Sequence, residues 1–431
     1  MLPTHSGLKP LLRKLKVYPR LRLHISFADI AASLSSFLYF SDDSQHIREI
    51  QSFWHTNKEV LVTLSVRTSL DLLLQSLNLP PGSEVLMSAV NIRDMVEIVQ
   101  RHKLVPVPVD ISLDTLAPKL DLLENLITEK TKIFIVAHLF GSIINLDPYS
   151  ELCKKHNLLL VEDCAQAFAG DKYYGHDGAD ISLFSFGPIK SCTALGGAVA
   201  IIQDKALASK IKSIEYDYCP KSEFWFLQRL LKYLSLKLLS LPWFYFNVLV
   251  ILKIFRKDID STINSMTRGF SKGDILDKIR YRPPKRMLAL LNRRLSNYHN
   301  DWVEKRQSNA RKFISLLLPE IVCLGSSAEY NSFWLVAILV SEPEFMMKKL
   351  RENGFDATRG STSLTFIDAS HFEKKYPNLL TLNSERLIKY VLYLPVSESL
   401  PGNEITYLAG LVNKYYCECS DANDTKKLYS R

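Results

Sequence analysis

The sequence predicts an α/β protein with a mostly parallel sheet, and three observations lead to this fold class. From residue 59 to about 164, short apolar runs rich in β-branched residues alternate with segments of helical spacing. This rhythm is typical of parallel strands joined by helices that cover both faces of the sheet. The composition, 47% hydrophobic and 23% charged, is ordinary for a globular protein. A length of 431 residues predicts a large domain and a smaller one.

Strands and helices are expected to follow one another regularly through the first half of the chain. A capping box at Ser26–Asp29 predicts the start of an early helix. Strands are expected at 59–65, at 80–88 after a turn, and at 104–110, 132–138 and 158–164. Helices are expected between them at 67–79, 92–103, 120–128 and 147–157. A loop at 185–198 then leads into an apolar strand at 199–202.

The alternation stops after Cys219, where an apolar segment begins. Residues 238–252 carry no charge, but Pro242 and Asn247 interrupt this run, and it is shorter than the roughly 20 residues of a spanning helix. Three interpretations stay open for 224–255: a buried or oligomer-contact hairpin, an interfacial membrane segment, or a transmembrane span. Aromatic residues, basic flanks and a basic N-terminal arm are the arguments for the interfacial segment.

The second half of the chain is predicted to hold long helices and a small α+β domain. The stretch 286–317 has a long, charge-rich helical pattern, while 332–340, 344–354 and 390–396 suggest a strand, a helix and a strand. The expected division is a basic arm and helix at 1–45, a large domain at 46–220, an apolar helical insertion at 221–260, connecting helices at 261–320, a small C-terminal domain at 321–415 and a tail at 416–431.

The charge distribution and the cysteine content indicate which partners and which redox environment fit the protein. The net charge is +9, and six lysines and arginines precede the first acid, Asp29. Such an arm fits an acidic partner or a solvated tail, and no zinc-finger spacing or nucleic-acid signature accompanies it. Seven scattered cysteines fit reduced thiols, and the N-terminus lacks the apolar core of a signal peptide. We expect a cytoplasmic protein without a metal site, with or without a membrane contact through 224–255.

Three groups of residues suggest chemistry at the ends of the expected strands. Glu162-Asp163 with Gln166 ends a strand, where a carboxylate holds a cation or a protonated ring nitrogen, or where Asp163 only caps a helix. Lys190 is a lone cation among small residues, which suits a Schiff-base lysine or a solvated loop lysine. Residues 65–69 combine hydroxyls and an arginine at a helix start, where free N–H groups bind phosphate or where Ser65 simply caps the helix.

The order of these groups is that of a pyridoxal-phosphate (PLP) enzyme of the aspartate-aminotransferase-like fold. Five motifs carry a closer resemblance: SVRTSL at 65–70, PVPVD at 106–110, HLFG at 138–141, VEDCAQA at 161–167, and the stretch from FSFGPIK to the double glycine at 184–197. In these motifs the chain resembles the DegT/StrS-like family of sugar aminotransferases, most clearly from 59 to 202. The resemblance implies a PLP-dependent transferase of fold type I, with a mostly parallel sheet in a large domain and a smaller α+β C-terminal domain.

The resemblance also implies a role for each matching residue. Lys190 would carry the cofactor as a Schiff base and shuttle a proton, and Asp163 would keep the ring nitrogen protonated. Gln166 would lie near the 3-oxygen of the ring, while Ser185 and the Arg67-Thr68 helix start would hold the phosphate. The family implies a homodimer that moves an amino group, usually from glutamate, to a keto sugar linked to a nucleotide. Such reactions serve the biosynthesis of polysaccharides, glycolipids or secondary metabolites.

Several positions depart from the family pattern. Val66 replaces the phosphate-loop glycine, Ile92 replaces the aromatic that stacks on the ring, and Leu195 replaces a glutamate before the double glycine. The family's Asn-Tyr-Arg-Met segment is Pro-Lys-Arg-Met at 284–287, where Lys285 or Arg286 could replace the missing donor. These departures keep a second hypothesis open, a catalytically degraded and membrane-associated scaffold with the PLP fold. A sugar dehydratase of the same family is disfavoured, because a histidine there replaces the lysine.

Overall fold

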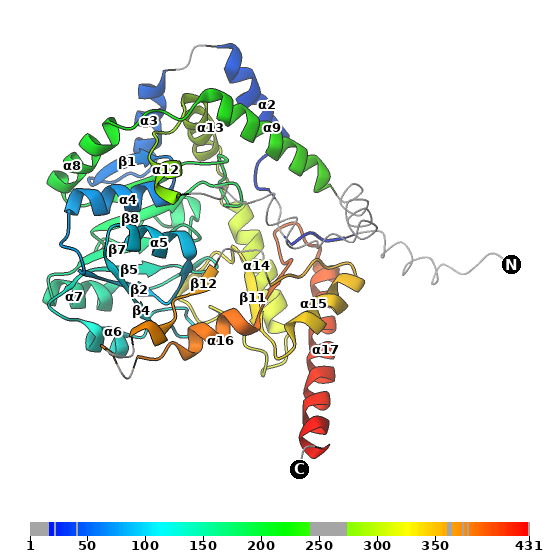
Figure 1. Ribbon diagram of the computed structural model, residues 1–431. Coiled ribbons are helices and arrows are strands. Elements are labelled where there is room, and N and C mark those ends of the chain that lie inside the picture. The colour runs from blue at the N-terminus through cyan, green and yellow to red at the C-terminus, as the bar shows by residue number, and fades with distance from the viewer. Residues whose placement is uncertain are drawn as a thin grey trace.

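The computed structural model describes residues 17–20, 23–39, 42–241, 274–359, 364–372, 375–376 and 379–429. Its centre is a seven-stranded sheet in the order β1-β9-β8-β7-β5-β2-β4 (Figure 1). These strands are β1 (Glu59–Thr63), β2 (Glu84–Ser88), β4 (Val105–Val109), β5 (Thr131–Ala137), β7 (Leu159–Asp163), β8 (Ile181–Ser185) and β9 (Ala198–Ile202). The strands from β8 to β4 run parallel, while β9 pairs antiparallel with β8 and β1. The predicted mostly parallel α/β sheet is confirmed.

Helices cover both faces of this sheet. One face packs against α4 (Val66–Leu77), α5 (Arg93–Arg101), α8 (Lys205–Tyr216) and α12 (Ile275–Ile279). The other face packs against α6 (Leu120–Leu126) and α7 (Asp147–Lys155). Alternate residues of β5 point to the two sides, with Ile133 and Ile135 in the first core and Phe134 and Val136 in the second. This burial on both faces explains why the strands are continuous apolar runs in the sequence.

Helices from distant parts of the chain cover the β1–β9 edge. They are α2 (Phe27–Ser35), the short η1 (Ser36–Leu38), α3 (Asp43–Ser52), α9 (Glu223–Leu239) and α13 (Lys285–Ser296). The predicted capping box starts α2, since Ser26 and Asp29 exchange side chain-to-backbone hydrogen bonds. Asp29 then binds the buried guanidinium of Arg294 on α13 at 2.7 Å. The early helix is therefore docked on α13, and α2 and α9 lie side by side in Figure 1.

The C-terminal part combines helices with small sheets. Its helices are α14 (Asp301–Ser315), α15 (Pro343–Glu352), α16 (Leu382–Tyr390) and α17 (Gly402–Tyr429). Strands β11 (Val336–Leu339) and β13 (Val391–Leu394) pair antiparallel. Two further strands reach back to the large sheet region, because β10 (Tyr330–Asn331) pairs with β6 (Ser142–Ile143) and β12 (Leu364–Phe366) pairs with β3 (Val90–Ile92). Short 3-10 turns lie at η2 (Gly170–Lys172) and η3 (Ala369–Phe372).

The helical pattern at 286–317 is divided between two helices. α13 ends at Ser296 and α14 begins at Asp301, so the long helices expected here are two separate elements. Tyr298 lies between them and packs edge-on against Phe168, with ring centroids 5.1 Å apart. Aromatic and asparagine residues are weak helix formers, and here a tertiary contact holds the break. The charge pattern could not reveal that contact.

The apolar insertion is described only in its first part. α9 covers residues 223–239, whereas the rest of the predicted segment, from 242 onward, lies outside the described residues, as does the N-terminal arm before residue 17. Within the described part of the chain, no helix combines the length and the apolar character needed to cross a bilayer.

Candidate active site

Asp163 lies where three parallel strands end next to one another. It is the last residue of β7, opposite Ala137 of β5 and Leu183 of β8. The side chain is 7% exposed, and its Oδ1 accepts a hydrogen bond from the Ala165 N–H at 2.9 Å. Burial raises the pKa of this carboxyl, while that hydrogen bond and the positive charges of Lys190, His138 and Arg67 act in the opposite direction. The site therefore favours a cationic partner for Asp163.

Lys190 follows β8 in a tight turn, and its backbone N–H bonds to the Gly187 carbonyl at 3.1 Å. Removal of the amine from water lowers the pKa of Lys190 to about 8; the charge of Asp163 raises it and that of Arg67 lowers it further. A substantial fraction of the amine is therefore neutral near pH 8, and the neutral form is the one that adds to a carbonyl carbon. The charges of Asp163 and Arg67 thus act on the Lys190 amine, and those of Lys190 and Arg67 act on the Asp163 carboxyl.

The start of α4 supplies the third part of the site. Ser65 is the N-cap, and its side chain accepts the Thr68 N–H at 3.2 Å. Arg67 pairs through Nε with Asp94 of α5 at 2.5 Å. The Thr68 hydroxyl is buried and donates to the Ile279 carbonyl at 2.9 Å, so the hydroxyl is committed to α12. The free N–H groups of this first turn suit an anion, and Val66, the first helical residue, has a negative φ, so no glycine is required there.

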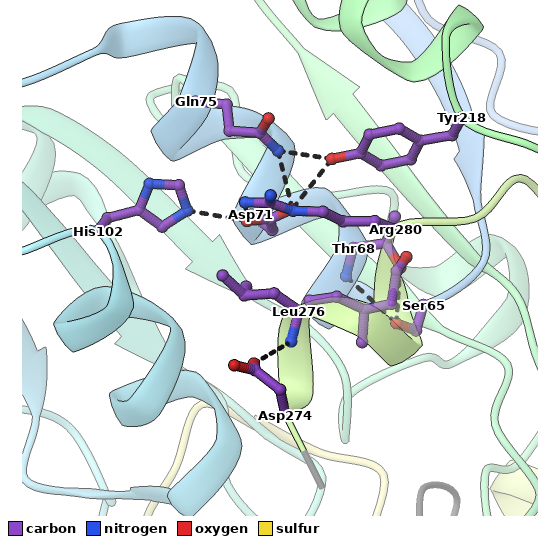
Figure 2. Close-up of polar contacts among 10 residues, drawn as sticks. Ser65, Thr68, Asp71, Gln75, His102, Tyr218, Asp274, Leu276 and Arg280 are labelled. Carbon is purple, nitrogen blue, oxygen red and sulfur yellow. Dashed lines mark hydrogen bonds and ion pairs between the residues drawn. The ribbon is translucent and has the colours of Figure 1, made fainter.

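Asp71, a buried carboxylate one helical turn after Thr68, joins α4 to side chains from other segments (Figure 2). Asp71 accepts two hydrogen bonds from Arg280, both at 3.0 Å. It also binds His102 at 2.8 Å and the Tyr218 hydroxyl at 3.0 Å. Burial alone would raise the pKa of Asp71, but the hydrogen bonds from His102 and Arg280 more than offset it and hold the pKa below its ordinary value. The segment that follows the apolar insertion is thus clamped onto the helix that starts at the candidate phosphate site.

Gln166 and Ser185 lie close in the chain to the carboxyl ends of β7 and β8. The Gln166 Oε1 accepts the Phe140 N–H at 2.9 Å, which ties it to the turn after β5. With that oxygen engaged, the amide NH2 is the group left to act as a donor. Ser185 ends β8, with the Gly187 N–H 3.5 Å from its hydroxyl oxygen. Both residues therefore lie on the rim formed by the strand ends.

Glu162, the residue before Asp163 in the chain, forms a fully buried pair with His138, and no role for this histidine was predicted from the sequence. The Nδ1 of His138 accepts the Ile144 N–H at 3.1 Å, so Nε2 carries the proton and donates to Glu162 at 2.7 Å. Burial would raise the pKa of Glu162, but His138, Ser182 and Tyr173 lower it to about 2. His138, Glu162 and Cys164 have potential metal ligands within 4.8 Å of one another. The histidine nitrogens and carboxylate oxygens are already engaged in hydrogen bonds, which favours a structural role.

The departures from the family pattern also have visible consequences. Leu195 adopts φ +62, and its carbonyl accepts a hydrogen bond from Arg229 of α9. The insertion helix therefore touches the lysine loop where the family has a glutamate. Lys285 pairs with Asp43 at 2.9 Å, while Arg286 lies 3.8 Å from Glu223. Both cations thus have acidic partners within their own chain.

Comparison with known proteins finds a family whose model matches the part of the chain that holds this site. Residues 42–228 match the model of the DegT/DnrJ/EryC1/StrS aminotransferase family. This part of the chain is therefore similar to that family. It contains the α4 start, Asp163 and Lys190, so the resemblance seen in the five motifs is confirmed.

Individual relatives agree with the assignment. The chain is 33% identical over 165 residues to the UDP-4-amino-4-deoxy-L-arabinose–oxoglutarate aminotransferase of Shewanella sediminis. The aligned stretch covers 38% of this chain and 42% of that protein. It is 29% identical over 187 residues to the GDP-perosamine synthase of Escherichia coli O157:H7, and this stretch covers 42% of this chain and 49% of the synthase. The chain thus matches less than half the length of these curated relatives.

Solved structures extend the likeness over nearly the whole chain. Helicobacter pylori PseC, an aminotransferase of pseudoaminic acid biosynthesis, superposes with a TM-score of 0.69 at 18% identity, over 94% of this chain and 100% of that one. Bacillus subtilis NtdA with bound PMP superposes with a TM-score of 0.65 at 20% identity, over 92% of this chain and 83% of that one. At this identity the likeness concerns the fold, which is that of the PLP-dependent sugar aminotransferases.

Proposed function

We propose that the protein is a PLP-dependent aminotransferase with Lys190 as its reactive amine. The observation that carries the proposal is the convergence of Lys190, Asp163 and the α4 start at the carboxyl ends of β7 and β8. This donor set fits PLP, because it offers a helix N-terminus to a phosphate, a buried carboxylate to a protonated ring nitrogen and a desolvated amine to an aldehyde. Burying such charges costs stability, which a scaffold without activity has no reason to retain.

Each residue of the site has a task of its own. The first turn of α4, with Arg67 and Ser185, would bind the phosphate group, and the Gln166 amide would orient the ring through its oxygen. Asp163 would balance a positive ring nitrogen. When bound, PLP supplies the electron sink that stabilises negative charge at the substrate carbon. Lys190, with its pKa lowered to about 8, is suited to take up and return a proton at that carbon.

Borohydride reduction tests the role of Lys190 directly. Protein incubated with PLP is expected to develop a visible absorbance band, and after reduction the added mass should lie on the peptide that contains Lys190. Lys190→Ala should lose the band and the adduct, and its aminotransferase activity should fall by at least about 10³-fold, since the nucleophile and proton carrier are removed together. Lys155, exposed on α7 and paired with Glu124, offers the matched control Lys155→Ala. A stable adduct elsewhere in the chain, with none on Lys190, would refute the assignment.

The amino donor, the acceptor and the oligomeric state are proposed from the resemblance to the family. We propose glutamate as the amino donor, a nucleotide-linked keto sugar as the acceptor and a homodimer as the working unit in the cytoplasm. The names of the curated relatives support an activated sugar and an oxoglutarate-linked exchange. Incubation with glutamate and a panel of keto-sugar nucleotides, with oxoglutarate as the measured product, would identify the acceptor. Size-exclusion chromatography with light scattering would measure the oligomeric state.

We further propose that α9 contacts a membrane surface. Phe224, Leu231 and Leu238 lie seven residues apart on its outer side and are 66%, 47% and 44% exposed. Lys232 and Lys237 are on the same helix. An exposed apolar stripe with lysines nearby suits the interface of an anionic bilayer.

Vesicle flotation checks this contact. The protein is expected to float with vesicles that contain phosphatidylglycerol and far less with pure phosphatidylcholine. Leu231→Glu with Leu238→Glu should reduce the bound fraction several-fold, because two charges enter the apolar stripe. Leu382→Glu, at an exposed leucine on α16, is the matched control. Unchanged flotation of the double variant would exclude α9 as the contact.

A further inference from the structure

The C-terminal part of the chain places one aromatic ring against Lys190. The Lys190 Nζ lies over the face of Trp334, 4.4 Å from the ring centroid. The indole N–H donates to the carbonyl of Ile189 at 3.0 Å. Trp334 is 6% exposed. One side chain thus binds two consecutive residues of the lysine loop, one by an edge hydrogen bond and one through its ring face.

Backbone contacts hold Trp334 in place. It lies between β10 and β11, in a segment that runs along the turn after β5, where the Ser332 N–H bonds to Gly141 at 2.8 Å and the Leu335 N–H bonds to Phe140 at 3.2 Å. Gly141 has φ +97, and a Cβ there would lie 2.6 Å from the Trp334 nitrogen, so the two segments approach as closely as glycine allows.

A buried arginine adds to this restraint. Arg306 of α14 donates to the Ser332 carbonyl at 2.8 Å and to the Ser191 hydroxyl at 3.3 Å. It is 3% exposed. Because Ser191 follows Lys190 and Ser332 lies two residues before Trp334, this guanidinium joins the lysine loop to the tryptophan segment. The tryptophan segment and the backbone of the lysine loop are therefore held in a defined relative position.

We propose that Trp334 is a positioning residue, which holds the Lys190 amine between rounds of reaction with a carbonyl compound. The electron-rich face of an indole attracts an ammonium group without supplying a proton acceptor. A carboxylate at the same place would hold the amine in its charged, unreactive form. The ring therefore restricts where Nζ lies and still lets it lose its proton. This inference rests on the proposed function, since it takes Lys190 as the reactive amine.

The rate of PLP capture by Lys190, measured against pH, tests the proposal. In Trp334→Leu, the plateau rate at high pH should fall about tenfold, because the smaller leucine leaves more space beside the neutral amine and restricts its position less. The apparent pKa of capture should also fall, because the ring no longer favours the ammonium form. Trp334→Phe keeps a ring face and should stay within about threefold of the wild-type rate. Trp302→Leu, at a half-exposed tryptophan of α14, is the matched control.

Two outcomes separate this inference from the proposed function. If the wild-type protein captures no PLP on Lys190, the proposed function itself fails. If capture is normal and Trp334→Leu keeps both the wild-type plateau and the wild-type apparent pKa, the positioning role is overturned. A purely structural role would alter thermal stability without moving the apparent pKa.

Tryptophan emission gives a second reading, which depends only on the conservative variant. Reduction of PLP onto Lys190 should quench the emission component present in the wild type and absent from Trp334→Phe. Equal fractional quenching in the two proteins would contradict the contact, even if Trp334→Leu fails to fold.

Discussion

Asp163→Asn is expected to remove most aminotransferase activity while leaving the protein without cofactor at least as stable as the wild type. The carboxylate is buried at the end of β7, and its burial raises the pKa, so its charge is costly in the unliganded fold. Asparagine keeps the shape and can accept the Ala165 hydrogen bond, but it cannot balance a positive ring nitrogen. Loss of one preorganised charge at a reacting centre reduces turnover by about 10²–10³-fold.

Three measurements on Asp163→Asn together test the proposed role of the carboxylate. Turnover with glutamate should fall, the thermal midpoint without PLP should stay level or rise, and the apparent pKa of Lys190 should drop below its present value of about 8. The last shift follows because the charge of Asp163 raises the pKa of Lys190. Asp177→Asn, at a fully exposed carboxylate, controls for a change of charge alone. Wild-type turnover by Asp163→Asn would remove Asp163 from the proposed site.

Asp71→Ala is expected to cause the largest loss of stability among these variants. The Asp71 side chain is fully buried, and its removal leaves Arg280, His102 and Tyr218 without their common acceptor. Breaking a fully buried pair costs about 3–5 kcal/mol. Because Arg280 is 38% exposed and can reach water, we expect a smaller loss of about 2–3 kcal/mol in the free energy of unfolding. The affinity for PLP should fall as well, because Asp71 anchors the helix whose first turn would hold the phosphate.

Urea unfolding at several pH values checks this prediction and its sign. The pKa of Asp71 is lowered in the fold, so its stabilisation is present at pH values above the ordinary carboxyl pKa of about 4 and is lost as the pH falls through the lower folded value. The difference between wild type and Asp71→Ala should therefore be steady from neutral pH to about pH 5 and close in stronger acid. Glu124→Ala, which breaks an exposed pair with Lys155, should show no measurable change. Equal midpoints for Asp71→Ala and this control would contradict the clamp.

Most elements were predictable because their signals are local. The strands of the first half are short apolar runs rich in β-branched residues, its helices show a period of 3.6, and the capping box at Ser26 depends on residues three apart. The break at 297–300 was not predictable, since it depends on the contact between Tyr298 and Phe168, which are far apart in the chain. The pairing of β1 with β9 likewise joins segments about 140 residues apart.

The candidate site shows the same division between local and distant causes. Lys190, Asp163 and Arg67 could be proposed from the sequence because each lies within a short motif, in the loop after a strand, at a strand end or at a helix start. Trp334 could not, because its stretch of sequence indicated only a strand, and nothing local relates it to a lysine 144 residues earlier. The engagement of the Thr68 hydroxyl with Ile279 was hidden for the same reason.

By itself, the sequence determined the fold class, the similarity of residues 42–228 to a known family and the residue types of the candidate site, because these depend on periodicity and on short motifs. The tertiary structure decided the environment of each group. It partly buried Lys190, so that desolvation lowers its pKa to about 8, and it set a tryptophan face against the amine. It also placed Asp71 under Arg280 to hold α4. Desolvation and charge pairing depend on which distant segments pack together, and no local pattern in the chain carries that information.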